Sequence, residues 1–248
     1  MLGLINGENF KIRKGNMSRI MVFVYLFFEI IYLFQSYNTF FGIDISEMAD
    51  DETIKVFSAV LGDLIHYGNI VKGSIILFGI FTLSGLLSAM FIVPIFTSIF
   101  VSDEFQTRGI HQSVSKGVSR YKIVLSKYLS ICEFITIMDV CAIVIGFVIT
   151  IITFGQGNIS IFVTQLIRFG MKLLLMNYAF VAIGLFFSFT IKNSAAAMVI
   201  NFIIIICLFG QLSTGLFSTN IMMPTISYII IAMIALFGSN IIFVKSDI

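Results

Sequence analysis

The sequence predicts an all-α, polytopic membrane protein with six transmembrane helices and both termini in the cytoplasm. Three observations support this fold class. Of the 248 residues, 58% are hydrophobic and only 11% are charged, whereas soluble domains carry about 25% charged residues. Long segments such as Phe202–Phe209 are apolar on every face, unlike the alternating strands of a membrane barrel. The lysines and arginines are also distributed unevenly between the loops. A water-soluble globule is therefore excluded.

Six apolar segments approach the length of about 20 residues that a bilayer-spanning helix needs. The predicted spans are Ser18–Gln35, Gly73–Phe100, Lys127–Thr150, Gly170–Thr190, Ala195–Leu212 and Thr225–Val244. They leave no room for a separate soluble domain, so we expect one transmembrane domain over residues 1–248. Residues 1–17 form its N-terminal cytoplasmic segment.

The orientation follows from the basic residues, because loops rich in lysine and arginine stay in the cytoplasm. With the N-terminus inside, 11 of the 15 lysines and arginines fall on the inner side. The charge distribution thus predicts cytoplasmic termini and a cytoplasmic loop over residues 101–126.

The first outer loop, residues 36–72, is long for a connection between spans. Its apolar residues recur at helical spacing and predict one amphipathic helix. They are Ile54, Phe57, Val60, Leu61, Leu64 and Ile65. We expect this helix to lie on the outer surface, where it serves either as a packed cap or as a gate.

The cytoplasmic loop contains a second amphipathic pattern. Ile110, Val114 and Val118 recur every fourth residue, while His111 and Lys116 between them are polar. This spacing predicts a short helix parallel to the membrane, with one side available to a partner.

The residues that follow predict how this helix ends. Gly117 can adopt the left-handed conformation that terminates helices, and Ser119 can cap the next helix. Three basic side chains, at Arg120, Lys122 and Lys127, are expected at the level of the lipid headgroups.

The order of residues in this loop resembles the permeases of type-2 ABC exporters. The resemblance rests on Glu104, Gly109, the amphipathic stretch Ile110–Lys116, the pair Ser119-Arg120, and Lys127. It is strongest to small bacterial permeases for bacteriocin or lantibiotic export and self-immunity.

The resemblance implies that the loop is a coupling helix that docks on an ABC ATPase. The residues implied in this contact are Glu104, Gly109, Ile110, Val114, Lys116 and Arg120. It further implies a bacterial cytoplasmic membrane, a dimer of ATPase subunits, and a second permease, identical or related. The substrate implied is an amphipathic peptide, exported by alternating access.

The sequence has no G-x-x-x-x-G-K-[ST] phosphate-binding loop. We therefore expect no ATPase activity on this chain, and ATP and Mg²⁺ are expected on the partner ATPase. No catalytic set and no metal-ligand spacing are found in the sequence, and no nucleic-acid partner is expected.

Three acidic residues, Glu29, Glu133 and Asp139, fall within predicted spans. Each costs about 2.5–3.5 kcal/mol at the centre of a bilayer on insertion scales, so such residues usually face protein or water. They could line a path for a cationic peptide or relay protons. They could instead be packing groups that meet polar residues such as Asn177, Tyr178 or Asn201.

Two other functions are compatible with these residues. An ATP-independent secondary transporter or channel would use Glu29 and Asp139 as its ion-coupling groups. A sensor or immunity subunit that does not transport would bind the peptide without moving it.

Overall fold

The computed structural model describes residues 1–16, 18–27, 91–107, 109–154, 159–217 and 222–245. Within these ranges the regular elements are all helices, which confirms the predicted all-α class for this part of the chain. The predicted outer-loop helix, Glu29 and most of the second predicted span lie outside the described residues. The six-span layout therefore stays a prediction.

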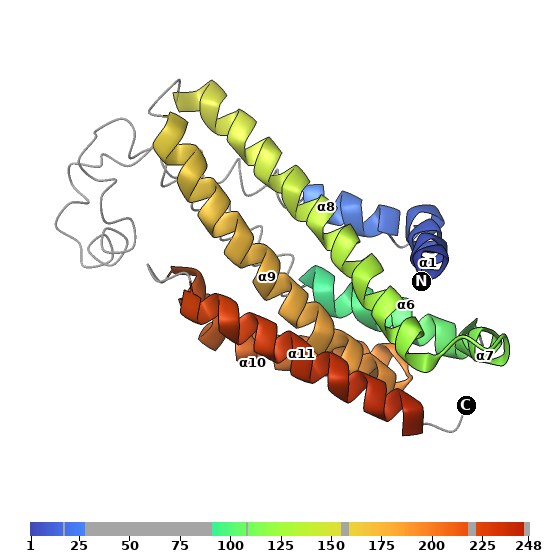
Figure 1. Cartoon of the computed structure of the whole chain (residues 1–248). Coiled ribbons are helices and arrows are strands. Elements are labelled where there is room, and N and C mark those ends of the chain that lie inside the picture. The colour runs from blue at the N-terminus through green and yellow to red at the C-terminus, as the bar shows by residue number, and fades with distance from the viewer. Residues whose placement is uncertain (17, 28–90, 108, 155–158, 218–221, 246–248) are drawn as a thin grey trace.

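The helices follow one another in a simple order (Figure 1). They are α1 (Leu2–Lys14), an unlabelled helix Ser18–Phe27, α6 (Val93–Gln106), α7 (Gly109–Ser115), α8 (Arg120–Phe154), α9 (Ile159–Ile191), α10 (Ser194–Phe217) and α11 (Met222–Lys245). The last four correspond to the last four predicted spans. However, α8 begins well before the predicted Lys127, because residues 120–126 continue the same helix.

Three segments of the described chain are long and apolar enough to cross a membrane: Arg120–Ile145, Gly170–Ile191 and Pro224–Lys245. On α11 the outward face is strongly apolar, since Ile234 and Phe237 are each 68% exposed. Water would disfavour such a surface, whereas lipid tails would cover it. These features are those of a membrane protein.

Helix α9 is the centre of the bundle and packs against α6, α8, α10 and α11. Its contact with α6 is close at Gly184, where an added Cβ would lie 2.5 Å from Oγ1 of Thr97. Small residues let helix backbones approach in this way within membranes. Gly184 thus sets the separation of α6 and α9.

A buried amide strengthens the same junction. The Nδ2 of Asn201, on α10, donates to the Ser98 Oγ of α6 at 2.7 Å and to the Gly184 carbonyl of α9 at 3.1 Å. It also lies 3.3 Å from the Ser188 Oγ. Hydrogen bonds of this kind hold helices together where apolar burial offers no driving force.

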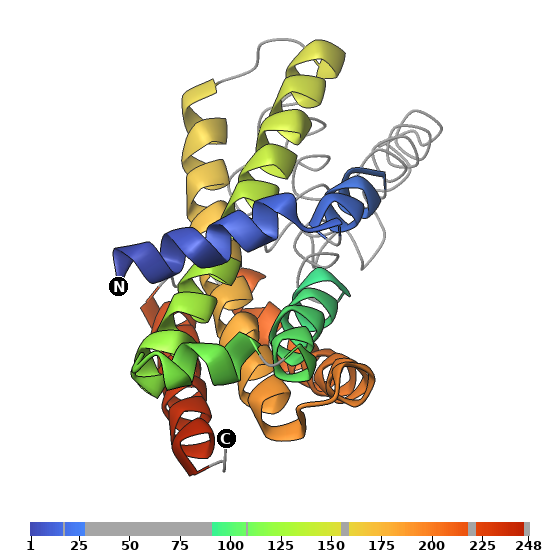
Figure 2. The same ribbon diagram turned by 90° about the vertical axis from the view of Figure 1, so that its right-hand side faces the viewer.

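The N-terminal helix, α7 and the C-terminal end of α11 lie on one side of the molecule (Figure 1), which faces the viewer in Figure 2. Side-chain contacts agree with the pictures. Lys11 of α1 pairs with Glu104 at the end of α6, and Arg120 at the start of α8 bonds to the end of α11. In Figure 2, α1 lies across α8 rather than along it. Three of the segments predicted to share the inner side thus lie on one side of the molecule.

Candidate functional site

The predicted amphipathic helix of the loop is present as α7, here called the loop helix. Its apolar side packs on the chain itself: Ile110 is completely buried, and Val114 is partly buried against the core. The polar side is open, because His111, Gln112 and Lys116 are exposed. The helix therefore presents only its polar side to any partner.

The end of the loop helix is a Schellman motif, a compact helix terminus built around a left-handed residue. Gly117 has φ +80°, as the sequence predicted. Its N–H donates to the carbonyl of Val114 at 2.9 Å, and the N–H of Val118 donates to that of Ser113 at 3.2 Å. The turn between α7 and α8 is thus held by its own backbone.

Helix α8 begins directly after this turn. The carbonyl of Ser119 accepts hydrogen bonds from the N–H groups of Lys122 at 2.9 Å and Ile123 at 3.3 Å. Because α6 extends to Gln106 and α8 starts at Arg120, the connection between them is shorter than the predicted 101–126. A short connection restricts the movement of the loop helix relative to α6 and α8.

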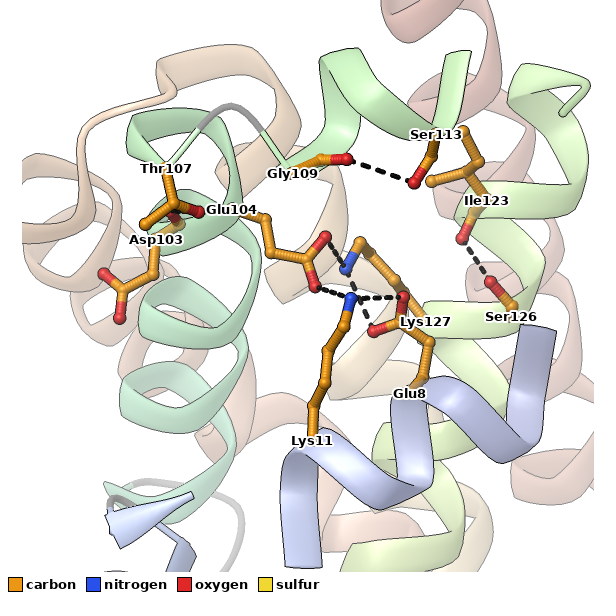
Figure 3. Close-up of polar contacts among 10 residues, drawn as sticks. All are labelled: Glu8, Lys11, Asp103, Glu104, Thr107, Gly109, Ser113, Ile123, Ser126 and Lys127. Carbon is orange, nitrogen blue, oxygen red and sulfur yellow. Dashed lines mark hydrogen bonds and ion pairs between the residues drawn. The ribbon is translucent and has the colours of Figure 1, made fainter. Parts of the chain in front are cut away.

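Beside the loop helix lies a group of four alternating charges, here called the charge cluster: Glu8, Lys11, Glu104 and Lys127 (Figure 3). The Nζ of Lys127 is 2.7 Å from Glu104 Oε2 and 3.2 Å from Glu8 Oε2. The Nζ of Lys11 is 2.9 Å from Glu104 Oε1 and 3.3 Å from Glu8 Oε1. The four groups join α1, α6 and α8.

Most of the charge cluster is removed from solvent. The side chain of Lys127 is 0% exposed and that of Glu104 is 14% exposed. The ammonium of Lys127 also lies 4.8 Å from the ring centroid of Phe100. Lys127, which the sequence predicted at the level of the lipid headgroups, thus contacts protein groups instead of lipid. Two carboxylates neutralise this lysine inside the protein.

The charge cluster shifts the pKa values of two of its members. Burial alone would raise the pKa of Glu104, but Lys127 and Lys11 outweigh it and hold that pKa below its ordinary value. Burial alone would lower the pKa of Lys11, but the two carboxylates outweigh it and raise that pKa. Each shift favours the charged form. Glu104 and Lys11 are consequently ionised at neutral pH.

Arg120, predicted at the level of the lipid headgroups and in the partner contact, binds its own chain. Its Nη1 donates to the carbonyls of Phe243 at 2.7 Å and Val244 at 2.8 Å. The guanidinium carbon also lies 5.6 Å from the ring centroid of Phe243. A cation at these last carbonyls satisfies a helix C-terminus, so Arg120 fixes the end of α11 beside the loop.

The predicted partner-contact residues therefore divide into two groups. Glu104, Ile110 and Arg120 contact this chain, and Val114 is partly buried. Gly109 packs beside Glu104, since an added Cβ would lie 3.8 Å from its Cγ. Of the predicted contact residues, Lys116 is the one that is fully exposed. His111, Gln112 and Ser115, which were not predicted in this contact, are exposed beside it.

Of the predicted pathway residues, the structure describes Glu133 and Asp139, and the two lie in different surroundings. Glu133 is 46% exposed and lies beneath α1, where it accepts a hydrogen bond from Asn9 Nδ2 at 2.6 Å. Arg13 Nη2 is 3.8 Å from the same carboxylate. Glu133 is therefore bound to the N-terminal helix rather than lining the interior.

Asp139 is buried in the bundle, with 1% of its surface exposed. It accepts a hydrogen bond of 2.7 Å from Asn177 Nδ2 of α9 and a long one of 3.5 Å from the Tyr25 hydroxyl. The predicted meeting with Asn177 is confirmed. Asp139 thus bridges α8, α9 and the helix Ser18–Phe27.

The sequence reasoning missed the N-terminal helix and its two charges in the cluster. Glu8 and Ile12 are both buried and lie four residues apart, a spacing that places them on one helical face. In the sequence, this four-residue spacing was the available sign of a helix with a packed face. In the described part of the chain no group of three or more His, Cys, Asp or Glu side chains is arranged to hold a metal ion.

Comparison with known proteins adds no relative. No protein-family model, no curated protein and no solved structure matches this chain.

Proposed function

We propose that this chain is the permease subunit of an ATP-driven ABC exporter that moves an amphipathic peptide across a bacterial cytoplasmic membrane by alternating access. The observation that carries the proposal is the loop helix: a short helix with an open polar side, set on the same side of the molecule as α1 and the C-terminal end of α11. The resemblance of the residues from Glu104 to Lys127 to the exporter permeases gives this helix its role. The ATPase, with its ATP and Mg²⁺, is a separate chain.

The loop helix is built to transmit a displacement rather than absorb one. Its apolar side rests on α6 and α8 through Ile110, which is fully buried. Its C-terminal end is fixed by the Schellman motif at Gly117. A push on the polar side therefore moves the ends of α6 and α8, which enter the bundle.

The charge cluster links three helices, so that they share this movement. Glu104 stands at the end of α6, only five positions before the loop helix begins at Gly109, and pairs with Lys127 of α8 and Lys11 of α1. Because Lys127 is fully buried, separation of these helices would expose an ammonium or leave it unpaired. The three helices should move as a unit when the ATPase subunits close.

The docking surface is the exposed side of the loop helix, with Gln112 at its middle and Lys116 at its end. The partners are two ATPase subunits, and a second permease copy or a related permease completes the transporter. Glu133 and Asp139 have protein partners of their own in this structure. We therefore assign them no contact with the peptide.

The test is co-purification with the ABC ATPase encoded nearest to this gene. Gln112→Glu combined with Lys116→Glu should lower the recovered ATPase at least tenfold, because both changes alter only the exposed side of the loop helix. The control is Lys245→Glu, which repeats the charge reversal of Lys116→Glu on an exposed lysine at the end of α11. If the wild-type chain binds no ATPase, or the double variant binds it normally, the proposal fails.

A further inference from the structure

The turn between α1 and the helix Ser18–Phe27 carries a concentration of positive charge. Residues 11–19 include four basic side chains and no acidic one. Lys11 is engaged in the charge cluster, and Arg13 lies 3.8 Å from Glu133. Among the described residues, Lys14 and Arg19 form no ion pair, and both are exposed. Two cations are thus available at this turn.

An exposed apolar face begins immediately after these cations. On the helix Ser18–Phe27, four large side chains share one face and point outward: Ile20 (55% exposed), Phe23 (70%), Val24 (38%) and Phe27 (52%). The rings of Phe23 and Phe27 are stacked, with centroids 6.3 Å apart. The opposite face, with Met21 and Tyr25, is buried in the bundle. The helix therefore has one side for protein and one side for an apolar solvent.

The geometry of the turn keeps the two features together. The hydroxyl of Ser18 donates to the carbonyl of Gly15 at 2.8 Å and also to that of Ile12. On α1, the ammonium of Lys14 lies 4.7 Å from the ring centroid of Phe10, which is itself 58% exposed. Lysines take up this position at a boundary between polar and apolar surroundings. The turn thus places positive charge at the edge of an apolar surface.

We propose that this turn is a binding site for an anionic phospholipid. Lys14 and Arg19 bind the phosphate of the headgroup, and Arg13, held by Glu133, adds to the positive field. One acyl chain lies along the face that Ile20, Phe23 and Phe27 form. The order along the helix, cations first and apolar side chains next, matches the order of headgroup and acyl chain in a lipid. This inference needs membrane insertion but does not depend on the proposed ATPase partner.

The chain contains no tryptophan, so a single introduced tryptophan is an unambiguous reporter. Phe23→Trp places it on the proposed site, and Phe237→Trp places it on the exposed face of α11 as the matched control. Each variant is reconstituted in vesicles of equal parts phosphatidylglycerol and phosphatidylcholine. Either the anionic or the zwitterionic lipid carries brominated acyl chains, which quench tryptophan on contact.

At Phe23→Trp the quenching should report a local excess of phosphatidylglycerol of at least about fivefold, the factor that one lysine or arginine contributes near an anionic lipid. At Phe237→Trp the two lipids should quench equally. Lys14→Gln with Arg19→Gln should abolish the excess, whereas Lys122→Gln with Lys245→Gln should preserve it. Equal quenching by both lipids at Phe23→Trp would overturn the proposal, as would an excess that survives loss of Lys14 and Arg19.

A salt titration keeps the test valid if the double variant does not insert. In about 1 M salt the Debye length falls to about 3 Å, so the excess at Phe23→Trp should decline towards unity in the otherwise wild-type chain. An excess that is unchanged by salt would contradict a site held by Lys14 and Arg19.

Discussion

Lys127 and Glu104 form an ion pair of 2.7 Å between α8 and α6, and the lysine side chain has no exposed surface. A buried ion pair adds little stability compared with two apolar side chains in the same place. The loss of one partner alone is costly, because it leaves a buried charge without its counter-charge. Glu8 provides a second carboxylate at 3.2 Å from the same ammonium. This pair therefore controls whether α1, α6 and α8 stay together.

Lys127→Met should be among the most destabilising substitutions at this end of the molecule. It removes the buried cation between Glu8 and Glu104 and leaves the half-exposed Lys11 as the remaining cation of the charge cluster, at a cost of about 3–5 kcal/mol. The melting temperature of the detergent-solubilised protein, followed by size-exclusion chromatography after heating, measures the effect. Lys11→Met is the matched control: Lys11 is 52% exposed, so its loss should cost about 1 kcal/mol or less. Equal losses from the two variants would contradict the assigned burial.

The charge cluster also predicts how stability depends on pH. Because the pKa of Glu104 is lowered, its ionised carboxylate adds to the free energy of unfolding. This contribution is fully present above the ordinary pKa of 4.5 and is lost as the pH falls through the folded-state pKa. The raised pKa of Lys11 gives stability that is complete below 10.5 and is lost as the pH rises through its folded-state pKa. The melting-temperature difference between wild type and Glu104→Gln should therefore be constant from about pH 5 to about pH 10. A steady decline between pH 5 and pH 8 would show that Glu104 is not held in its charged form.

Gly117→Ala tests the turn after the loop helix. The positive φ of Gly117 is unfavourable for a residue with a side chain, and the cost is about 1–2 kcal/mol. An added Cβ would meet nothing within 4 Å, so the whole effect is conformational. Gly109→Ala is the control, because its Cβ would make only ordinary contacts at 3.8 Å. Thermal melts should show a loss for Gly117→Ala and little change for Gly109→Ala, and the reverse order would contradict the assigned turn.

Substitutions of Asp139 test whether this residue bridges helices or couples transport to an ion. Asp139→Leu removes the acceptor for Asn177 and Tyr25 and should cost about 1–3 kcal/mol. Asp139→Asn keeps one acceptor oxygen, so it should fold, melt closer to wild type and retain export in vesicles supplied with ATP. Loss of export by a well-folded Asp139→Asn would favour the ATP-independent transporter instead.

The local features of this fold were accessible from the sequence. The apolar runs predicted the helices, and the four-residue spacing of Ile110, Val114 and Val118 predicted the loop helix. Gly117 predicted where the loop helix ends, because glycine is the residue that most readily adopts the left-handed conformation. Each of these signals depends on neighbours within a few positions, which is why pattern reading succeeded.

The charge cluster was not accessible in the same way. Glu8 and Lys127 are 119 positions apart, and a lysine before an apolar run is usually a headgroup anchor. Only the packing of α1 across α8 converts Lys127 into a buried residue. The partners of Glu133 were inaccessible for the same reason, since Asn9 and Arg13 belong to α1.

The most direct test of the central claim, that the loop helix docks on an ATPase, is photocrosslinking in living cells. Gln112→p-benzoylphenylalanine places a photoreactive group on the exposed side of that helix, and Ile110→p-benzoylphenylalanine provides the buried comparison. Mass spectrometry identifies the adducts. The proposal predicts that position 112 crosslinks to a protein carrying the G-x-x-x-x-G-K-[ST] phosphate-binding loop, while position 110 crosslinks only within this chain. Adducts at position 112 that contain only this chain or lipid would contradict it.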